Sequence, residues 1–229
     1  MARSLRIFIA LFLLVTLAPA GAAGLDAISA EESGGALRQA LSQGAVAAVS
    51  SLGRTDGFLG NPKVKILLPE NLQKAEKLMR KLGMGKYADE LILSMNRAAE
   101  AAVPEAKELL LNAVKQMTLQ DAKGILTGGD DSVTQYFKRT TSEPLTEKFL
   151  PIVRQATERV DLVQKYNRYA KQGAKLGLID KKDASLEGYV TQKALDGLFL
   201  MIAEEERAIR QNPLGQASSL LQKVFGALK

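Results

Sequence analysis

Apolar residues recur at helical spacing along nearly the whole chain. They return every three or four residues in most segments, and sustained alternation of apolar and polar residues is rare. This pattern predicts an all-α protein, a multi-helix globular bundle with one short extended segment near residues 63–69. The segment Val64–Pro69 is the only strand-like piece, and we expect it to lie across helices because a single strand has no partner.

Caps and turn residues divide this pattern into separate helices. Pro69 suits the first position of a helix, Gly83 suits its end, and Thr118 with Asp121 has the spacing of a capping box. Pro144 is expected to separate two helices, and a further break at Pro151 is left open. The predicted helices are residues 36–52, 69–82, 86–103, 118–127, 131–141, 145–172, 183–211 and 216–228. Pro104 either kinks the helix over 86–103 or begins a further helix over 104–117. Asp130 or Asp131 begins the helix before residue 141, and Asp183 or Ser185 begins the helix that ends at residue 211.

The N-terminus has the three parts of a secretory leader. Arg3 and Arg6 precede an apolar run over residues 7–17, and the small residues 18–23 offer cleavage sites. We therefore predict a cleaved signal peptide over residues 1–22. Residues 23–229 are predicted to form a single helical domain, with two lobes left open. A buried N-terminal helix is the alternative.

This leader predicts a soluble, exported protein of the bacterial periplasm and cell envelope. Its apolar run is too short to span a bilayer comfortably, and no other stretch approaches the roughly 20 apolar residues that a spanning helix needs. We therefore expect no transmembrane helix in the mature chain. The chain contains 0 Cys, so we expect neither a lipoprotein anchor nor a disulfide.

Composition also narrows the chemistry. With 0 His and 0 Cys, the chain lacks an imidazole base, a thiolate nucleophile and the usual ligands of zinc, copper or haem. We therefore expect no metal and no cofactor. Catalysis by two carboxylates, or by a serine with a lysine, is compatible with this composition, but neither has a recognisable motif.

The net charge argues against nucleic acid as a partner. The formal charge is +6, of which Arg3 and Arg6 supply two, and basic residues alternate with acids without forming a long block. A weak attraction to anionic lipid head groups is left open.

Some polar residues fall where helical stripes turn inward. Asn96 and Glu100 lie on the apolar stripe of helix 86–103, and Glu205 follows Met201 in helix 183–211. A buried carboxylate is costly unless it is paired, so a facing cation is expected. Such residues could line a polar pocket that orients a ligand, or form a structural ion pair that fixes helix register. The candidate cations are Arg97, Arg207 and Arg210.

Two further segments each have two interpretations. The loop over residues 55–61 could be a mobile flap, or a turn whose Phe58 and Leu59 pack into the core. The amphipathic helix 216–228 has basic residues on its polar side and could lie on a membrane, on a partner, or on the core of its own chain.

Several blocks of sequence occur together across the chain. They are Gly57-Phe58 before Ile66-Leu67-Leu68-Pro69; Asn96-Arg97-Ala98-Ala99-Glu100-Ala101-Ala102; Met117-Thr118 with Asp121-Ala122 and Ile125-Leu126; Gly128 and Thr134-x-Tyr136-Phe137; Leu198-Phe199 with Glu204-Glu205-Glu206 and Ile209-Arg210-Gln211-Asn212-Pro213; and Val224-Phe225-Gly226. With these blocks the chain resembles the bacterial family named domain of unknown function 4197 (DUF4197). The resemblance implies an uncharacterised exported protein and no particular activity.

The resemblance also implies that these polar positions belong to a shared design. We therefore predict that Glu100, Glu205 and Arg210 form one interior network, with Thr134 and Tyr136 near it. The full set of predicted site residues, as a ligand-binding site or a buried polar network, is Asn96, Glu100, Thr134, Tyr136, Glu205 and Arg210.

Two functions from different classes fit this sequence. The first is a non-catalytic binding or envelope-assembly module for a lipid-like molecule or another envelope protein, favoured by abundant Ala, Leu and Val without catalytic groups. The second is a carboxylate-dependent hydrolase of an envelope polymer, with Glu100 or Glu205 as general acid. It needs two carboxyl groups roughly 5 to 9.5 Å apart in an open cleft. We favour binding and leave enzyme activity undecided.

Overall fold

The computed structural model describes residues 30–83, 85–158, 163, 167 and 185–211. Among these residues every regular element is a helix, which confirms the predicted all-α class. The elements are α1 (Ala30–Leu52), α2 (Glu70–Lys81), α3 (Gly85–Ala102), the short 3-10 helix η2 (Val103–Glu105), α4 (Ala106–Gln116), α5 (Leu119–Thr127), α6 (Ser132–Thr157) and α8 (Leu186–Gln211).

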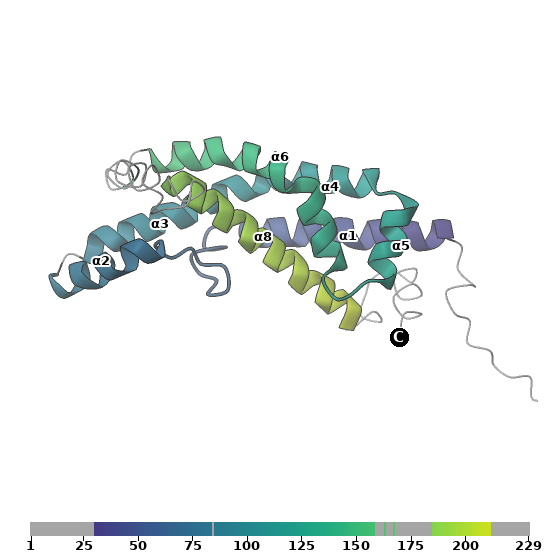
Figure 1. Cartoon of the computed structure of the whole chain (residues 1–229), viewed down its shortest axis with the longest axis horizontal. Coiled ribbons are helices and arrows are strands. Elements are labelled where there is room, and N and C mark those ends of the chain that lie inside the picture. The colour runs from purple at the N-terminus through teal and green to yellow at the C-terminus, as the bar shows by residue number, and fades with distance from the viewer. Residues whose placement is uncertain (1–29, 84, 159–162, 164–166, 168–184, 212–229) are drawn as a thin grey trace, which may run out of the picture.

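The long helices α1, α3, α6 and α8 form the body of the molecule (Figure 1). Helix α6 packs along α8 and α3, and α1 packs against α8 and α4. Helices α4 and α5 lie at one end of the body, and the hairpin of α2 and α3 lies at the other. The apolar stripes of these helices meet in one core, which contains the fully buried Phe58, Phe137 and Phe149.

Several predicted boundaries are confirmed. The Thr118 side chain accepts from the Asp121 amide while the Asp121 side chain accepts from the Thr118 amide, so the capping box is present at the start of α5. Gly83 follows α2 with φ of 75°, the left-handed conformation expected after a helix end. The chain between Lys65 and Pro69 has no regular secondary structure and pairs with no strand among the described residues.

The predicted break at Pro144 is wrong. Helix α6 continues through both Pro144 and Pro151. A proline inside a helix costs about 3 kcal/mol because it removes a hydrogen bond and crowds the preceding turn. The stripe of Leu145, Phe149 and Val153 is fully buried beyond the first proline, and burying such side chains returns roughly 1.5–3 kcal/mol each. Packing therefore outweighs the local cost.

Two sequence predictions lie outside the described residues. They are the signal peptide over residues 1–22 and the amphipathic helix over residues 216–228. Most of the predicted helix beyond residue 158 lies outside them as well. No helix within the described ranges is long and apolar enough to cross a membrane.

The loop after α1 is anchored by a buried aromatic ring. Phe58 is fully buried, so the interpretation of this loop as a turn that packs into the core is confirmed at this residue. The ring reaches the surface of α8 at Gly197, where a Cβ atom would lie 2.7 Å from Phe58 Cε1 and 3.3 Å from Val64 Cβ. Glycine at position 197 is what lets the loop lie this close to α8.

Gly197→Ala should therefore lower the free energy of unfolding by about 1–3 kcal/mol, because the added methyl group overpacks the core. Gly124→Ala in α5 is the matched control. A Cβ atom at position 124 would meet nothing within 4 Å, so this change should stabilise by up to about 1 kcal/mol. Denaturant unfolding followed by circular dichroism measures both, and an equal response of the two variants would contradict the packing at Gly197.

Candidate functional site

An apolar groove runs between α1 and α8 beside the start of α6. The space in and in front of it is about 340 Å³, which counts open solvent, so the groove itself is shallow and small. Small side chains of α1 form one wall, and larger apolar side chains of α6 and α8 form the other. The lining residues of this α1–α8 groove are Ala40, Leu41, Gly44, Ala45, Val133, Phe137, Ile202, Glu205, Glu206, Ile209 and Arg210.

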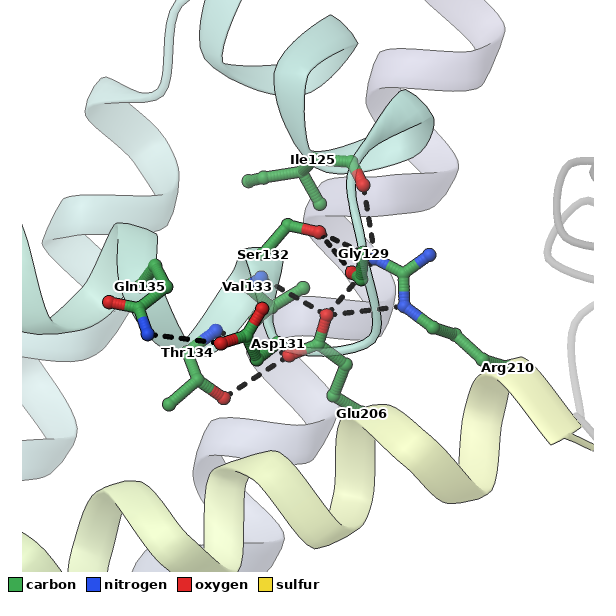
Figure 2. A network of polar contacts seen from close by, with 9 residues as sticks. All are labelled: Ile125, Gly129, Asp131, Ser132, Val133, Thr134, Gln135, Glu206 and Arg210. Carbon is green, nitrogen blue, oxygen red and sulfur yellow. Dashed lines mark hydrogen bonds and ion pairs between the residues drawn. The ribbon is translucent and has the colours of Figure 1, made fainter.

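The polar part of the groove is the contact between Glu206 of α8 and the start of α6 (Figure 2). One Glu206 oxygen accepts the backbone N–H of Val133 at 3.1 Å, and the other accepts the backbone N–H and the hydroxyl of Thr134, both at 3.1 Å. These amides lie in the first turn of α6, where backbone N–H groups have no partner within the helix. Asp131 holds the N-cap position, but its side chain makes no capping hydrogen bond. Glu206 therefore caps α6 from a different helix.

Arg210 completes this cluster. It lies one turn after Glu206 on α8, and its Nη2 donates to Glu206 at 3.0 Å, to the Ser132 hydroxyl at 3.2 Å and to the carbonyl of Ile125 at 3.0 Å. The side chains of Glu206 and Arg210 are 2% and 14% exposed. The pair thus joins the end of α5, the start of α6 and α8, and both of its charges are used within the protein.

The predicted role of Glu205 in this network is wrong, because the buried glutamate is Glu206. The sequence interpretation extended the inward stripe of α8 from Leu198 to Met201 and then to Glu205. In the structure the stripe continues from Leu198 to Ile202, which is 2% exposed, and then to Glu206. A helix advances 3.6 residues per turn, so a one-residue error at position 201 carries to the next turn. Glu205 is half-buried and lines the groove.

Glu100 holds a second irregular segment. It is 4% exposed on α3, and its Oε1 accepts the backbone N–H groups of Phe58 at 3.0 Å and Leu59 at 3.1 Å. Arg97 donates to its other oxygen at 2.5 Å and to Asp56 at 2.7 Å. Arg97 is thus the predicted facing cation, and the group fixes the loop that carries Phe58.

Asn96 holds the segment over residues 65–69 by hydrogen bonds to its backbone. It is fully buried, its Oδ1 accepts the Ile66 N–H at 2.8 Å, and its Nδ2 donates to the Ile66 carbonyl at 2.9 Å and to the Ile92 carbonyl at 2.7 Å. The amide side chain thereby pairs with Ile66 as a neighbouring strand would. This replaces the missing strand partner.

Tyr136 stands apart from these clusters. Its hydroxyl donates to the Ala113 carbonyl of α4 at 2.6 Å. Burial of the ring raises the pKa of the Tyr136 phenol, so it remains a protonated donor near neutral pH. Tyr136 links α6 to α4.

The predicted single network of Glu100, Glu205 and Arg210 is therefore wrong. Glu100 pairs with Arg97, Arg210 pairs with Glu206, and the two groups share no hydrogen-bond partner. Only Thr134 joins Arg210, through Glu206. Whether any of the predicted site residues binds a ligand stays a prediction.

The buried polar groups have little unused capacity for chemistry. Among the described residues, the Thr191 hydroxyl is the one fully buried side-chain polar atom without a hydrogen-bond partner. Within the same ranges no cluster of acidic side chains could hold a metal ion. The groove can therefore offer shape and apolar contact, with Glu205 as the carboxylate at its edge that has no partner among the described residues.

Glu206→Gln tests the capping role. The change leaves the Arg210 charge without its partner and turns one accepting oxygen into a donor that faces backbone N–H groups. We expect the free energy of unfolding to fall by roughly 3 kcal/mol or more. Glu205→Gln, one residue away and half-exposed, should change it by less than about 0.5 kcal/mol. Denaturant unfolding separates the two, and a larger loss for Glu205→Gln would contradict the assignment.

Comparison with known proteins agrees with the resemblance of the sequence blocks. A family model described as "Protein of unknown function (DUF4197)" matches residues 27–226. No curated protein and no solved structure matches the chain. Because the matched region includes every described element and most of the 229 residues, the chain belongs to the DUF4197 family.

Proposed function

We propose that this protein is an exported, non-catalytic binding or envelope-assembly module of the periplasm. Its α1–α8 groove would take an apolar group carried by a lipid-like molecule or by another envelope protein. The observation that carries this proposal is the groove itself, an open apolar depression whose two buried charges are paired with each other. Such a site binds by burying apolar surface.

The dimensions of the groove favour a small apolar group. The space of about 340 Å³ counts solvent in front of the open mouth, so the part walled by protein is much smaller than the roughly 300–1,000 Å³ of a pocket for a drug-sized molecule. The groove therefore suits the end of an acyl chain or one apolar side chain, and not a whole lipid. Gly44 and Ala45 keep the α1 wall low, so an occupant could contact the helix backbone closely.

The alternative, a carboxylate-dependent hydrolase, receives less support. A glycosidase needs one carboxyl group that can hold and release a proton and a second within reach of the same bond. Glu205 has no partner among the described residues, but the other carboxylate that lines the groove, Glu206, is already engaged. The oxygens of Glu100 and Glu206 accept backbone N–H groups and arginine side chains from within the protein. A glutamate held in this way is poorly suited to proton transfer.

Export is tested by the mass of the mature protein. When the full chain is expressed in a bacterium and recovered from the periplasm, its intact mass should correspond to cleavage between Ala20 and Ala23, because the leader has a small-residue cleavage site. A protein that keeps residues 1–22 and remains in the cytoplasm would contradict the proposed compartment.

Binding is tested by filling the groove. A Cβ atom at Gly44 would lie 3.6 Å from Glu205 Cβ, so Gly44→Leu should place a side chain in the groove without a backbone clash. Native mass spectrometry of the periplasmic protein, followed by organic extraction, should find a bound lipid-like molecule. Its occupancy should fall at least about tenfold in Gly44→Leu.

Gly124→Leu is the matched control, because position 124 lies outside the groove in open space. It should retain the bound molecule. If the wild-type protein carries no molecule but co-purifies with one envelope protein that Gly44→Leu loses, the apolar group belongs to a protein partner. If neither a molecule nor a partner depends on Gly44, the proposal is wrong.

A further inference from the structure

A second surface, remote from the groove, has a different chemistry. Helix α2 makes its extensive helix contacts with α3 alone, so it forms a hairpin with α3, which also packs against α6 and α8 in the body. Figure 1 shows this hairpin on the left of the molecule, with α4 and α5 at the opposite end. Most of α2 is therefore not needed to close the core.

The turn of the hairpin is both basic and apolar. Between residues 77 and 87 the chain has three lysines, one arginine and no acidic residue, and its other residues are apolar or glycine apart from Tyr87. Leu78, Leu82 and Tyr87 are 58%, 66% and 50% exposed. Three of the seven large apolar side chains that the described residues expose thus lie in these eleven positions, which we call the hairpin tip.

The spacing of these residues arranges them in lines. Leu78 lies on α2, and Leu82, four residues later, is the C-cap residue whose N–H bonds to the Leu78 carbonyl. Lys77 and Lys81 have the same spacing on the adjacent face. A row of lysines therefore runs beside a row of leucines towards the turn. This is the pattern of a helix end that inserts apolar side chains below lipid head groups while its cations remain among them.

The cations of the tip are available to a partner. Arg80 pairs with Glu76 at 2.8 Å and with Asp89 of α3 at 2.6 Å, which occupies these neighbouring acids and ties the two helices together. Lys77, Lys81 and Lys86 are exposed and have no ion pair within the described part of the chain. Arg80 thus stiffens the hairpin, and the three lysines remain uncompensated.

We propose that the hairpin tip docks on an anionic phospholipid surface. Leu78, Leu82 and Tyr87 enter the interface between head groups and acyl chains, and Lys77, Lys81 and Lys86 contact the phosphates. Exposed leucines alone would fit many partners. The combination with three lysines that form no ion pair among the described residues, beside the acids Glu76 and Asp89 that Arg80 engages, is complementary to a negatively charged interface. This docking is independent of what the α1–α8 groove binds.

The chain offers a direct optical test because it contains 0 Trp. Leu82→Trp in the full chain places a single tryptophan at the tip, and Leu119→Trp places one at an equally exposed position on α5. With vesicles of phosphatidylcholine containing about one third phosphatidylglycerol, emission of the tip tryptophan should shift to shorter wavelength and that of position 119 should not. With pure phosphatidylcholine both should stay unshifted.

Raising the salt concentration separates the electrostatic contribution of the lysines from the apolar contribution of the leucines and Tyr87. Molar salt should weaken vesicle binding by at least about tenfold relative to low salt. Each basic residue near an anionic surface adds to the binding free energy, and salt screens this attraction. No shift at position 82 on anionic vesicles, or equal shifts at positions 82 and 119, would overturn the proposal. Binding to an acidic protein without any shift on vesicles would overturn it as well.

Charge reversal tests whether the lysines of the hairpin tip are the ones that bind the vesicles. In the Leu82→Trp chain, Lys77→Glu, Lys81→Glu and Lys86→Glu together should lower vesicle partitioning more than about tenfold. The matched control is a second triple variant in which three exposed lysines of α4 and α5 are changed to glutamate, so that both triple variants have the same net charge. The changed residues are Lys107, Lys115 and Lys123.

Equal loss in the two triple variants would mean that only net charge matters and would overturn the proposal. Helix content by circular dichroism should be unchanged in both, because all six positions are exposed. If the glutamate variants lose helix content, the same comparison is made with glutamine at each position, and the tip variant should again lose more binding.

Discussion

The structure depends on how buried backbone N–H groups in irregular segments and in the first turns of helices obtain hydrogen bonds. A buried N–H without a partner costs about 1–3 kcal/mol, and a bundle without a sheet has no strand to provide one. Here side chains on helices supply the acceptors: Asn96 holds Ile66, Glu100 holds Phe58 and Leu59, and Glu206 holds Val133 and Thr134. Asn167 accepts the Leu186 N–H at the start of α8 in the same way.

These buried polar side chains stabilise the fold, and their hydrogen-bonding capacity is used within the protein. Glu100 and Glu206, which resemble catalytic carboxylates by their burial, are engaged with backbone and arginine. The surfaces that remain for partners are the apolar α1–α8 groove and the exposed hairpin tip. On the two proposals made above, the groove would bind by shape and apolar contact, and the hairpin tip by charge together with apolar contact.

Much of the fold can be predicted from the sequence because the dominant signals are local. Helical periodicity, the Thr118 capping box and Gly83 give the elements and several of their ends. Asn96 and Glu100 could be identified as inward polar residues, with Arg97 as a partner, since three and four residues along a helix share a face. The continuation of α6 through Pro144 could not be predicted, because it depends on what the later turns bury.

The candidate site was harder to predict for a geometric reason. Choosing Glu206 over Glu205 requires the stripe of α8 to be followed within one residue over several turns, and Met201 and Ile202 are both apolar. The α6 partners of Glu206 are more than seventy residues away in the sequence, so no local pattern links them to it. Residues of three helices line the groove, so no local sequence pattern predicts it either.

Residue-resolved hydrogen exchange, followed by nuclear magnetic resonance, tests the central claim most directly. If side chains satisfy the buried backbone, the amides of Phe58, Leu59, Ile66 and Val133 should exchange as slowly as the interior of α3, despite lying in irregular segments or a first helical turn. Exchange of these amides as fast as that of Asp130, in an exposed turn, would contradict the account.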